Sequence, residues 1–455
     1  MDKIAVIGSG AYGSYTINAL LENNPNVEIT LFEVGDAVIK NERQIGYRTN
    51  IVKRNYLATS KGRFFGFGGA TNKWGGAILL FTKNDFKNCK GFLKDIVDLD
   101  EKYKETVYTK FGFKNRFEEH VINSDLFTKQ GIWLGYFRRN LFKYFKISKR
   151  PQVHIECNAR VNKFNIENDK IISIEYIKDG KKQTDSFDQY YLTAGAFESH
   201  RILLNSGISL ENNTFKFSDH ISQKVFKIYG DTKIGEDDFA FRISGTSFIT
   251  NRIIGEIDGY SYFANPIYNS DFPFFQNLKK LLFKGHFSLN LLLCIFKDIP
   301  SCLGFMWSVI VKKKLFVYKG IWDIYIDLEN PIENCNIKLS EQKDEYGEKA
   351  LDLTFEVGES ASEMFVKAKR QIQNYLDANH VKYEVYTDKI EVEKAEDTYH
   401  PFGMFFKFNS VEEYFSKFAN MLVVNTGVLP HAGGINSTAA MFPLVEEYIR
   451  RKNER

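Results

Sequence analysis

The sequence predicts an α/β fold in which a doubly wound, mostly parallel sheet is joined to a second, α+β domain. Three observations lead to this prediction. The chain opens with an apolar run, a Gly-rich turn and a helical segment, and a similar strand-turn-helix pattern returns near residue 194. Its length of 455 residues, with 44% hydrophobic side chains, is enough for two sizeable cores.

The first strand is expected over Lys3 to Ile7, a short apolar run typical of a parallel strand buried on both faces. "GSGAYG" follows it and supplies a G-x-G-x-x-G turn. The glycines of such a turn permit a tight bend, close approach of backbone to a pyrophosphate, and close packing of helix on strand. In this turn they are Gly8, Gly10 and Gly13, with Ala11 and Tyr12 between them.

The second strand is expected over Glu28 to Phe32, and Glu33 follows it twenty residues after Gly13. An acidic side chain at this place accepts hydrogen bonds from an adenosine ribose and disfavours a 2′-phosphate. Strand, turn, helix and acid together predict a dinucleotide-binding, Rossmann-like domain. The residues of this unit leave NAD and FAD both open.

Two further stretches point to the same ligand. Gly66 to Gly76, "GFGGATNKWGG", is a second Gly-rich loop, whose backbone is expected to lie close to a flat group of the ligand. Later, the apolar run Tyr190 to Thr193 turns at Ala194, Gly195 and Ala196 into a helix, which predicts a second strand-turn-helix unit.

With these motifs the chain resembles the glucose-methanol-choline (GMC) oxidoreductases, flavoproteins that oxidise alcohols. Counterparts of the family's motifs follow one another in the family's order from Lys3 to about Tyr448. They are Gly68 to Gly76, Ala194 to Ile208, Asp219-His220, Glu329 to Leu339, His400 to Gly403, and Pro430 to Asn436. The resemblance implies FAD rather than NAD.

The resemblance also implies roles for single residues. His400 is expected to be the base that takes the hydroxyl proton, and Asn436 is expected to hydrogen-bond the substrate oxygen. An unperturbed imidazole, with a pKa of about 6.5, suits the first role. His431 and His220 are expected to be structural. The residues expected to bind FAD are Gly8, Gly10, Ala11, Tyr12, Gly13, Glu33, Gly68, Gly69, Ala70, Asn72, Lys73, Trp74, Gly75, Val161, Ala194, Gly195, Asn425, Thr426, Asn436 and Ser437.

Three departures from the family pattern stand out. Asn425 replaces the usual Asp before the last motif, which alters the expected contact with the flavin side chain. The second Gly-rich loop has Asn72, Lys73 and Trp74 where relatives with covalently attached FAD use His, so we expect noncovalent FAD. The usual Pro after Asn436 is missing.

The order of the motifs predicts two domains that are discontinuous in sequence. The FAD-binding domain is expected from residues 1–80, 150–220 and 400–455. The substrate-binding domain is expected from the insertions 81–149 and 221–399. A ligand pocket at the junction of two domains is a common arrangement.

Composition excludes several classes of protein. The 61 basic and 57 acidic residues are spread along the chain, so we expect no nucleic-acid partner. Five cysteines without C-x-x-C or Cys/His spacing predict neither a disulfide framework nor a metal site. Because "MDKIAVIGSG" enters a strand at once, without a cleavable leader, we expect a cytoplasmic protein.

An apolar segment, residues 286–311, leaves two interpretations open. Its two apolar runs are interrupted by Lys297, Asp298 and Pro300, so neither reaches the about 20 residues of a spanning helix. The favoured interpretation is a pair of helices packed in the substrate domain. The other is peripheral contact with the inner membrane face through residues 278–316, with Lys279, Lys280, Lys284 and Lys312 to Lys314 on anionic headgroups.

Together these features predict FAD-dependent oxidation of an alcohol, with hydride transfer to the flavin. By resemblance to short bacterial members, we expect a carbohydrate hydroxyl, including that of a lipid-linked sugar, as the substrate. Two alternatives on the same scaffold are a lyase that keeps FAD and a non-catalytic flavin-bound subunit. The electron acceptor, oxygen or another molecule, is not indicated by the sequence.

Overall fold

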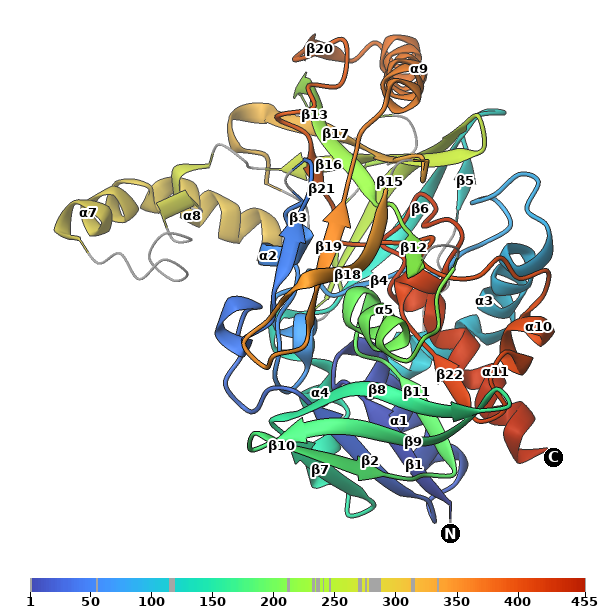
Figure 1. Cartoon of the computed structure of the whole chain (residues 1–455). Helices are drawn as coiled ribbons and strands as arrows, with labels where there is room; N and C mark the ends of the chain where they lie inside the picture. The colour runs from blue at the N-terminus through green and yellow to red at the C-terminus, as the bar shows by residue number, and fades with distance from the viewer. Residues whose placement is uncertain are drawn as a thin grey trace.

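The computed structural model combines a parallel sheet, an antiparallel sheet and a projecting helical arm (Figure 1). The structure describes residues 2–54, 56–113, 119–210, 213–230, 234, 238–239, 241–244, 247–268, 272–274, 276–277, 288–311, 316–333 and 335–454.

The parallel sheet has five strands in the order β22-β11-β1-β2-β7, and every neighbouring pair in it is parallel. Its strands come from the beginning, middle and end of the chain: β1 (Lys3–Ile7), β2 (Glu28–Glu33), β7 (Val153–Cys157), β11 (Gln189–Leu192) and β22 (Met421–Val423). The predicted strand over Lys3 to Ile7 is confirmed, and four of its five residues are buried. The α/β fold class is therefore confirmed.

Helices and a small sheet cover this parallel sheet. Helix α1 (Ala11–Asn23) packs on β1 and β11, and α4 (Leu141–Tyr144) and α11 (Phe442–Asn453) pack on α1; α3 (Gly91–Lys110) packs on α11, and α10 (Val411–Ser416) packs on α3. Tyr15 of α1 stacks on Phe442 of α11 with ring centroids 4.0 Å apart, which joins the two ends of the chain. The small sheet is an antiparallel meander, β8 (Ala159–Glu167), β9 (Lys170–Lys178) and β10 (Lys181–Asp185), and Tyr176 of β9 packs edge-on against Phe32 of β2.

The second large sheet has ten strands among the described residues. Its main path runs β20-β13-β17-β16-β15-β6-β4, with antiparallel neighbours. Helix α9 (Glu359–Ala378) packs against β15 and β17 of this sheet and lies at the top of the molecule (Figure 1). The strands are β4 (Ala77–Ile78), β5 (His120–Val121), β6 (Leu126–Trp133), β13 (His220–Tyr229), β14 (Phe241–Ser244), β15 (Ser247–Ile257), β16 (Tyr260–Tyr268), β17 (Ile321–Glu329), β20 (Lys382–Val385) and β21 (Glu396–Asp397).

A four-stranded sheet stands between these two parts. Its order is β12-β18-β19-β3, from β3 (Thr49–Ile51), β12 (Thr214–Lys216), β18 (Asn336–Lys343) and β19 (Lys349–Thr354). The remaining short elements that matter for the site are α2 (Ala58–Lys61), α5 (Ala196–Asn205) and the 3-10 turns η2 (Gly69–Asn72), η3 (Tyr136–Arg138), η8 (Thr426–Val428) and η9 (Ala439–Met441). The predicted domain boundaries stay a prediction.

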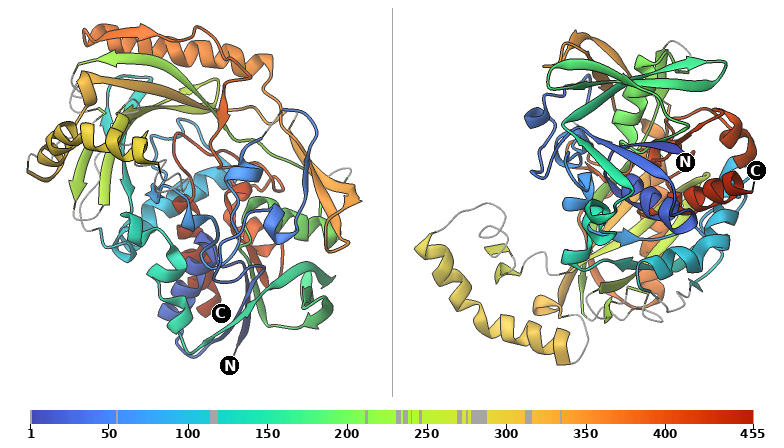
Figure 2. Two further views of the ribbon diagram at one scale, coloured as in Figure 1. Left: turned by 90° about the vertical axis from the view of Figure 1, so that its left-hand side faces the viewer. Right: turned by 90° about the horizontal axis from the view of Figure 1, so that it is seen from below.

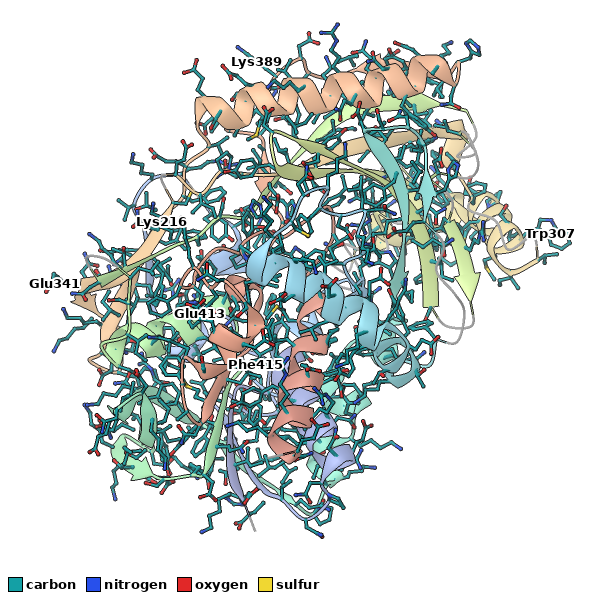
Figure 3. The ribbon with its side chains drawn as sticks, turned by 90° about the vertical axis from the view of Figure 1, so that its right-hand side faces the viewer. Lys216, Trp307, Glu341, Lys389, Glu413 and Phe415 are labelled. Carbon is teal, nitrogen blue, oxygen red and sulfur yellow. The ribbon has the colours of Figure 1, made fainter. Side chains whose placement is uncertain are left out.

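The apolar segment forms an arm that leaves the body of the molecule. We call residues Ser288–Val311 the arm; it contains α7 (Leu289–Lys297), α8 (Ile299–Met306) and a π-helical turn, η6 (Trp307–Val311). All three directions of view show it projecting outward (Figures 1 and 2), with α7 at its tip and Trp307 at the edge of the view from the opposite side (Figure 3).

Neither α7 nor α8 has a buried residue, so the prediction that they pack in a core is wrong. Among the described residues no single helix is long and apolar enough to cross a membrane, although α7 and α8 together, bent by 53°, meet the length and composition required. The flanking residues Lys279, Lys280, Lys284, His286 and Lys312 to Lys314 lie outside the described residues.

Candidate functional site

A cavity of about 470 Å³ opens beyond the carboxyl ends of β1 and β11. Its walls come from both large sheets, since Gly8 and Thr193 follow strands of the parallel sheet and Trp133 ends β6 of the antiparallel sheet. The carboxyl ends of parallel strands are the usual place for ligands in α/β folds. The predicted site residues that line this cavity are Gly8, Gly10, Ala11, Tyr12, Glu33, Gly69, Ala70, Lys73, Trp74, Gly75, Val161, Ala194, Gly195, Thr426, His400 and Asn436.

The first Gly-rich turn has the three geometries that its spacing predicts. Gly8 has φ +98°, and a Cβ there would lie 2.8 Å from Ala194 Cα. A Cβ on Gly13 would lie 1.9 Å from the Gly8 carbonyl oxygen, so Gly13 is needed for helix packing and does not line the cavity. A Cβ on Gly10 would meet nothing within 4 Å. Gly10 therefore leaves open space at the N-terminus of α1, where unpaired amides attract anions.

Glu33 ties the two Gly-rich segments together. One carboxylate oxygen accepts hydrogen bonds from the amide and hydroxyl of Ser9, at 3.0 and 2.7 Å. The other accepts from the amides of Gly35 and Gly66, at 3.0 and 3.1 Å. A carboxylate has about four acceptor sites. A ribose hydroxyl at Glu33 would therefore share an oxygen with one of these protein donors.

The second Gly-rich loop packs on the first turn. A Cβ on Gly69 would lie 3.2 Å from Gly10 Cα. Asn72 turns its amide into the loop, where it donates to the carbonyls of Phe67 and Gly69, and the Trp74 indole donates to the Arg139 carbonyl at 2.9 Å. Gly68 and Asn72 thus shape this loop without lining the cavity.

The third predicted stretch packs directly against the first turn. Thr193 Oγ1 donates to the carbonyl oxygens of Ile7 and Gly8, at 2.8 and 3.0 Å. Gly195 has φ +80°, which a non-glycine residue adopts only with strain, and a Cβ there would meet nothing within 4 Å. The N-terminus of α5 therefore also borders open space.

His400 lines the cavity and its backbone is fixed from behind. Its amide donates to both oxygens of Asp219, at 3.1 and 3.2 Å, and its Nδ1 lies 3.4 Å from Thr398 Oγ1. Burial, together with the charges of His220 and Arg252, lowers the pKa of His400 to about 3. The imidazole is therefore neutral at physiological pH. Its pKa lies well below the value of about 6.5 expected for an unperturbed histidine.

Asn436 is held by a residue that the sequence did not indicate. Arg252 of β15 donates from Nη1 to Asn436 Oδ1 at 3.0 Å. Because an amide has one acceptor oxygen and one donor nitrogen, this bond assigns the oxygen to Arg252 and leaves the NH₂ group for the cavity. Arg252 is fully buried, and its guanidinium lies 4.7 Å from the Phe263 ring centroid. A lone Arg in a strand carries no sequence signal for this role.

The other two histidines of the predicted motifs, His220 and His431, lie outside the cavity. Glu329 accepts from the amides of Ala432 and Gly433, at 2.6 and 2.9 Å, and lies 3.4 Å from His431 Nδ1. His220 Nε2 contacts the Gly433 carbonyl oxygen at 2.7 Å. Glu329 and His220 therefore hold the loop that carries Asn436, and the carboxylate of Glu329 raises the pKa of His431 against the effect of its burial.

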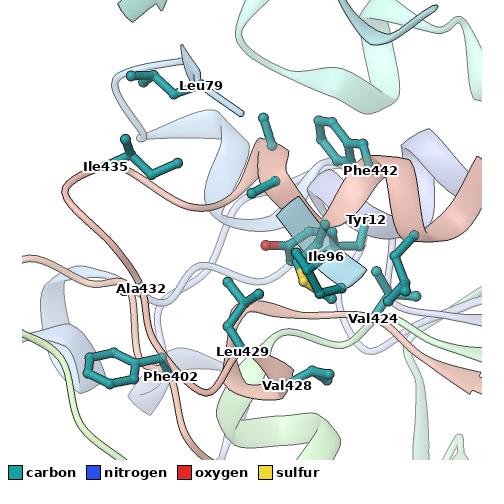
Figure 4. Close-up of a cluster of buried hydrophobic side chains, with 14 of the residues drawn as sticks. Tyr12, Leu79, Ile96, Phe402, Val424, Val428, Leu429, Ala432, Ile435 and Phe442 are labelled. Atoms are coloured by element: carbon teal, nitrogen blue, oxygen red, sulfur yellow. The ribbon is translucent and has the colours of Figure 1, made fainter. Parts of the chain in front are cut away.

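Asn425 and Ser437 are buried and do not line the cavity. Neither the amide atoms of Asn425 nor Ser437 Oγ has a hydrogen-bond partner among the described residues. These segments belong to a tightly packed apolar cluster in which Val424, Val428 and Leu429 lie near Tyr12 and Phe442 (Figure 4). Thr426, the neighbour of Asn425, does reach the cavity.

Several cavity residues were not predicted from the sequence. Arg63 lines the wall, where it pairs with Glu42 at 2.9 Å and with Glu198. Trp133 contributes its ring, which a Cβ on Gly75 would approach to 2.5 Å. Both come from segments without a motif, so only the fold brings them to the site. Tyr47, Lys61 and Thr438 also line the cavity.

Comparisons with known proteins give a match at the level of fold. No family model and no curated protein matches the sequence. Among 563 matching chains of solved structures is pyridoxine 4-oxidase from Mesorbium loti, with a TM-score of 0.56, 12% sequence identity and full coverage of both chains. The chain is therefore similar in fold to that protein over its whole length. Since one fold hosts many functions, this likeness by itself identifies no substrate.

Proposed function

We propose that this protein is an FAD-dependent oxidoreductase that oxidises an alcohol. The observation that carries the proposal is a single cavity lined both by two Gly-rich turns and by His400 and Asn436. The similar fold of a protein named pyridoxine 4-oxidase supports it.

The residues present fit an FAD. Gly10 and Gly195 leave open space at two helix N-termini, as a pyrophosphate and a neighbouring ring would require. No cysteine lines the cavity among the described residues, and His400 is its one histidine there, which supports noncovalent binding. In this proposal Gly8, Gly10 and Ala11 hold the phosphates, and Ala70, Trp74 and Gly75 lie against the ring.

A bound flavin supplies the hydride acceptor that alcohol oxidation requires. His400 is the side chain that accepts the hydroxyl proton in this proposal, and its imidazole is unprotonated at physiological pH. Nε2 is the nitrogen for this step, since Nδ1 lies beside Thr398. The NH₂ group of Asn436 donates to the same substrate oxygen and thereby positions it.

As the substrate we propose a carbohydrate hydroxyl, including that of a sugar joined to a lipid. Polar groups for its hydroxyls are at hand, because Arg63, Lys61 and Thr438 border the cavity together with His400 and Asn436. Reoxidation of the reduced flavin by oxygen or by another acceptor is a separate step, and measuring it identifies the electron acceptor.

The test is anaerobic reduction of the purified protein, followed by its flavin absorbance. Yellow protein should release FAD on acid precipitation, and one of a panel of sugars, sugar conjugates and simple alcohols, with pyridoxine included, should bleach it. Flavin that is bound but reduced by no alcohol would favour a lyase or a non-catalytic subunit instead. Colourless protein that takes up NAD would overturn the proposal.

A further inference from the structure

Exposed apolar side chains are concentrated in the arm, and they have no role in the candidate site. Nine of the 21 exposed large apolar side chains among the described residues lie within these few turns, each between 40% and 76% exposed. They are Leu289, Leu293, Phe296, Ile299, Leu303, Met306, Trp307, Ile310 and Val311. The other twelve are distributed along the chain from Val38 to Tyr399, and single exposed apolar side chains are normal for a protein in water.

The exposed side chains form a stripe along both helices. In α7 they recur at Leu289, Leu293 and Phe296, and in α8 and the following turn at Ile299, Leu303, Met306 and Ile310. These spacings of three and four residues place them on one face of each helix. Figure 3 shows Trp307 pointing away from the body of the molecule.

The arm has almost no polar face to offer to water. Lys297 and Asp298, at the bend, are its charged residues, and the rest of its polar side chains are Asn290 and three serines. A surface helix of a protein in water normally carries a charged face opposite its apolar one, whereas helices as apolar as these are covered by protein or lipid.

The net charge of this segment distinguishes between two possible partners of the arm, a second copy of the chain and a lipid surface. Residues 278–316 contain seven lysines and one aspartate, a net charge of +6, and since the whole chain carries +4, the remainder carries −2. Six of these lysines lie outside the described residues, and they flank the arm in the sequence. A symmetric dimer through the arm would bring two such segments together and set like charges against each other. An anionic lipid surface attracts them instead.

We propose that the arm binds peripherally to an anionic lipid bilayer, with its apolar stripe in the boundary between headgroups and acyl chains. The 53° bend between α7 and α8 suits a hydrophobic wedge that lies in the interface rather than a straight span. Trp307 is the side chain expected to anchor it at the headgroup level, and Phe296 is expected to enter the apolar layer.

Co-sedimentation of the full chain with lipid vesicles tests this proposal. The protein should bind vesicles of phosphatidylglycerol and phosphatidylcholine, and bind vesicles of phosphatidylcholine alone roughly 10-fold less or weaker still, since each lysine near an anionic surface contributes to attraction. High salt should weaken binding by screening, and detergent should complete the release.

Matched substitutions identify the surface. Leu293→Glu with Leu303→Glu should reduce partitioning roughly 10-fold per substitution, because each places a charge where an apolar side chain would enter lipid. Phe137→Glu is the control, since Phe137 is 94% exposed but lies outside the arm, and it should bind vesicles like the parent. Equal melting temperatures would show that all variants fold.

Fluorescence adds an independent readout. Acyl chains that carry bromine should quench Trp307, which is 58% exposed, and Trp307→Phe should lose this quenching while it still binds vesicles. Absence of vesicle binding at low salt would overturn the proposal. So would quenching that persists in Trp307→Phe, or a dimer that forms through the arm and is abolished by the Leu293 and Leu303 substitutions without any lipid binding.

Discussion

At the scale of single residues, the roles proposed for His400 and Asn436 can be tested separately. His400→Ala should slow flavin reduction by about 10²- to 10⁴-fold with FAD still bound, which is the usual contribution of a positioned base. Asn436→Ala should also slow it, and the double variant should lose less than the product of both effects, because the two groups act on one oxygen. Stopped-flow absorbance under anaerobic conditions measures these rates.

His431→Ala is the control for this experiment. It removes a contact with Glu329 outside the cavity, so the chemical step should change little. A His431→Ala protein that fails while His400→Ala keeps the parent rate would place the chemistry on the other histidine.

Arg252 acts through His400 and Asn436, so its substitution should change the pH profile of flavin reduction. Its charge contributes, after burial, to the low pKa of His400 of about 3, so reduction should stay near its plateau from neutral pH down to about pH 5 and fall only in stronger acid, as the imidazole becomes protonated. Arg252→Gln removes that charge, which should raise the pKa of His400 and move the acid limb to higher pH. It should also slow reduction by roughly 10-fold, because Asn436 loses its orientation.

Arg252→Lys separates charge from geometry. It keeps the positive charge but not the planar fork that meets Asn436 Oδ1, so the acid limb should stay where it is while the rate still falls. Measured limbs that coincide in all three proteins would show that Arg252 does not influence the base.

At the scale of elements, the two Gly positions of the first turn predict opposite failures. Gly10 has φ −63° and open space beyond its Cα, so Gly10→Val should fold and yet bind no flavin, because the side chain enters the space for the pyrophosphate. Gly13→Val should instead destabilise the protein, since its Cβ would overlap the Gly8 carbonyl. Flavin content and thermal melting together distinguish the two, and a yellow Gly10→Val protein would contradict the assigned position of the phosphates.

These elements also show what sequence patterns can predict. The strand Lys3–Ile7 and the turn after it were predictable because their constraints are local: apolar residues for a buried strand, and glycines where backbone must turn or approach closely. The bond from Arg252 to Asn436 joins residues 184 positions apart, and no local pattern encodes such a pairing. The arm was mistaken for a core because an apolar run indicates burial but not the partner that covers it.

At the scale of the whole molecule, the cavity joins segments from the entire chain, so ligand and fold should stabilise each other. Residues before position 80, near 195 and beyond 398 line it together, and unfolding would separate them. A ligand that binds only the folded state adds about 2.7 kcal/mol at 100 times its dissociation constant. With an unfolding entropy of about 2 cal/mol/K per residue, this corresponds to a rise in melting temperature of about 3 °C for a chain of 455 residues. Apoprotein titrated with FAD should show that rise, and Gly10→Val should show none at the same concentrations. The arm variants should keep the full shift, since they leave the cavity intact. If FAD stabilised Gly10→Val as much as the parent, the flavin would have to bind elsewhere than over the first Gly-rich turn.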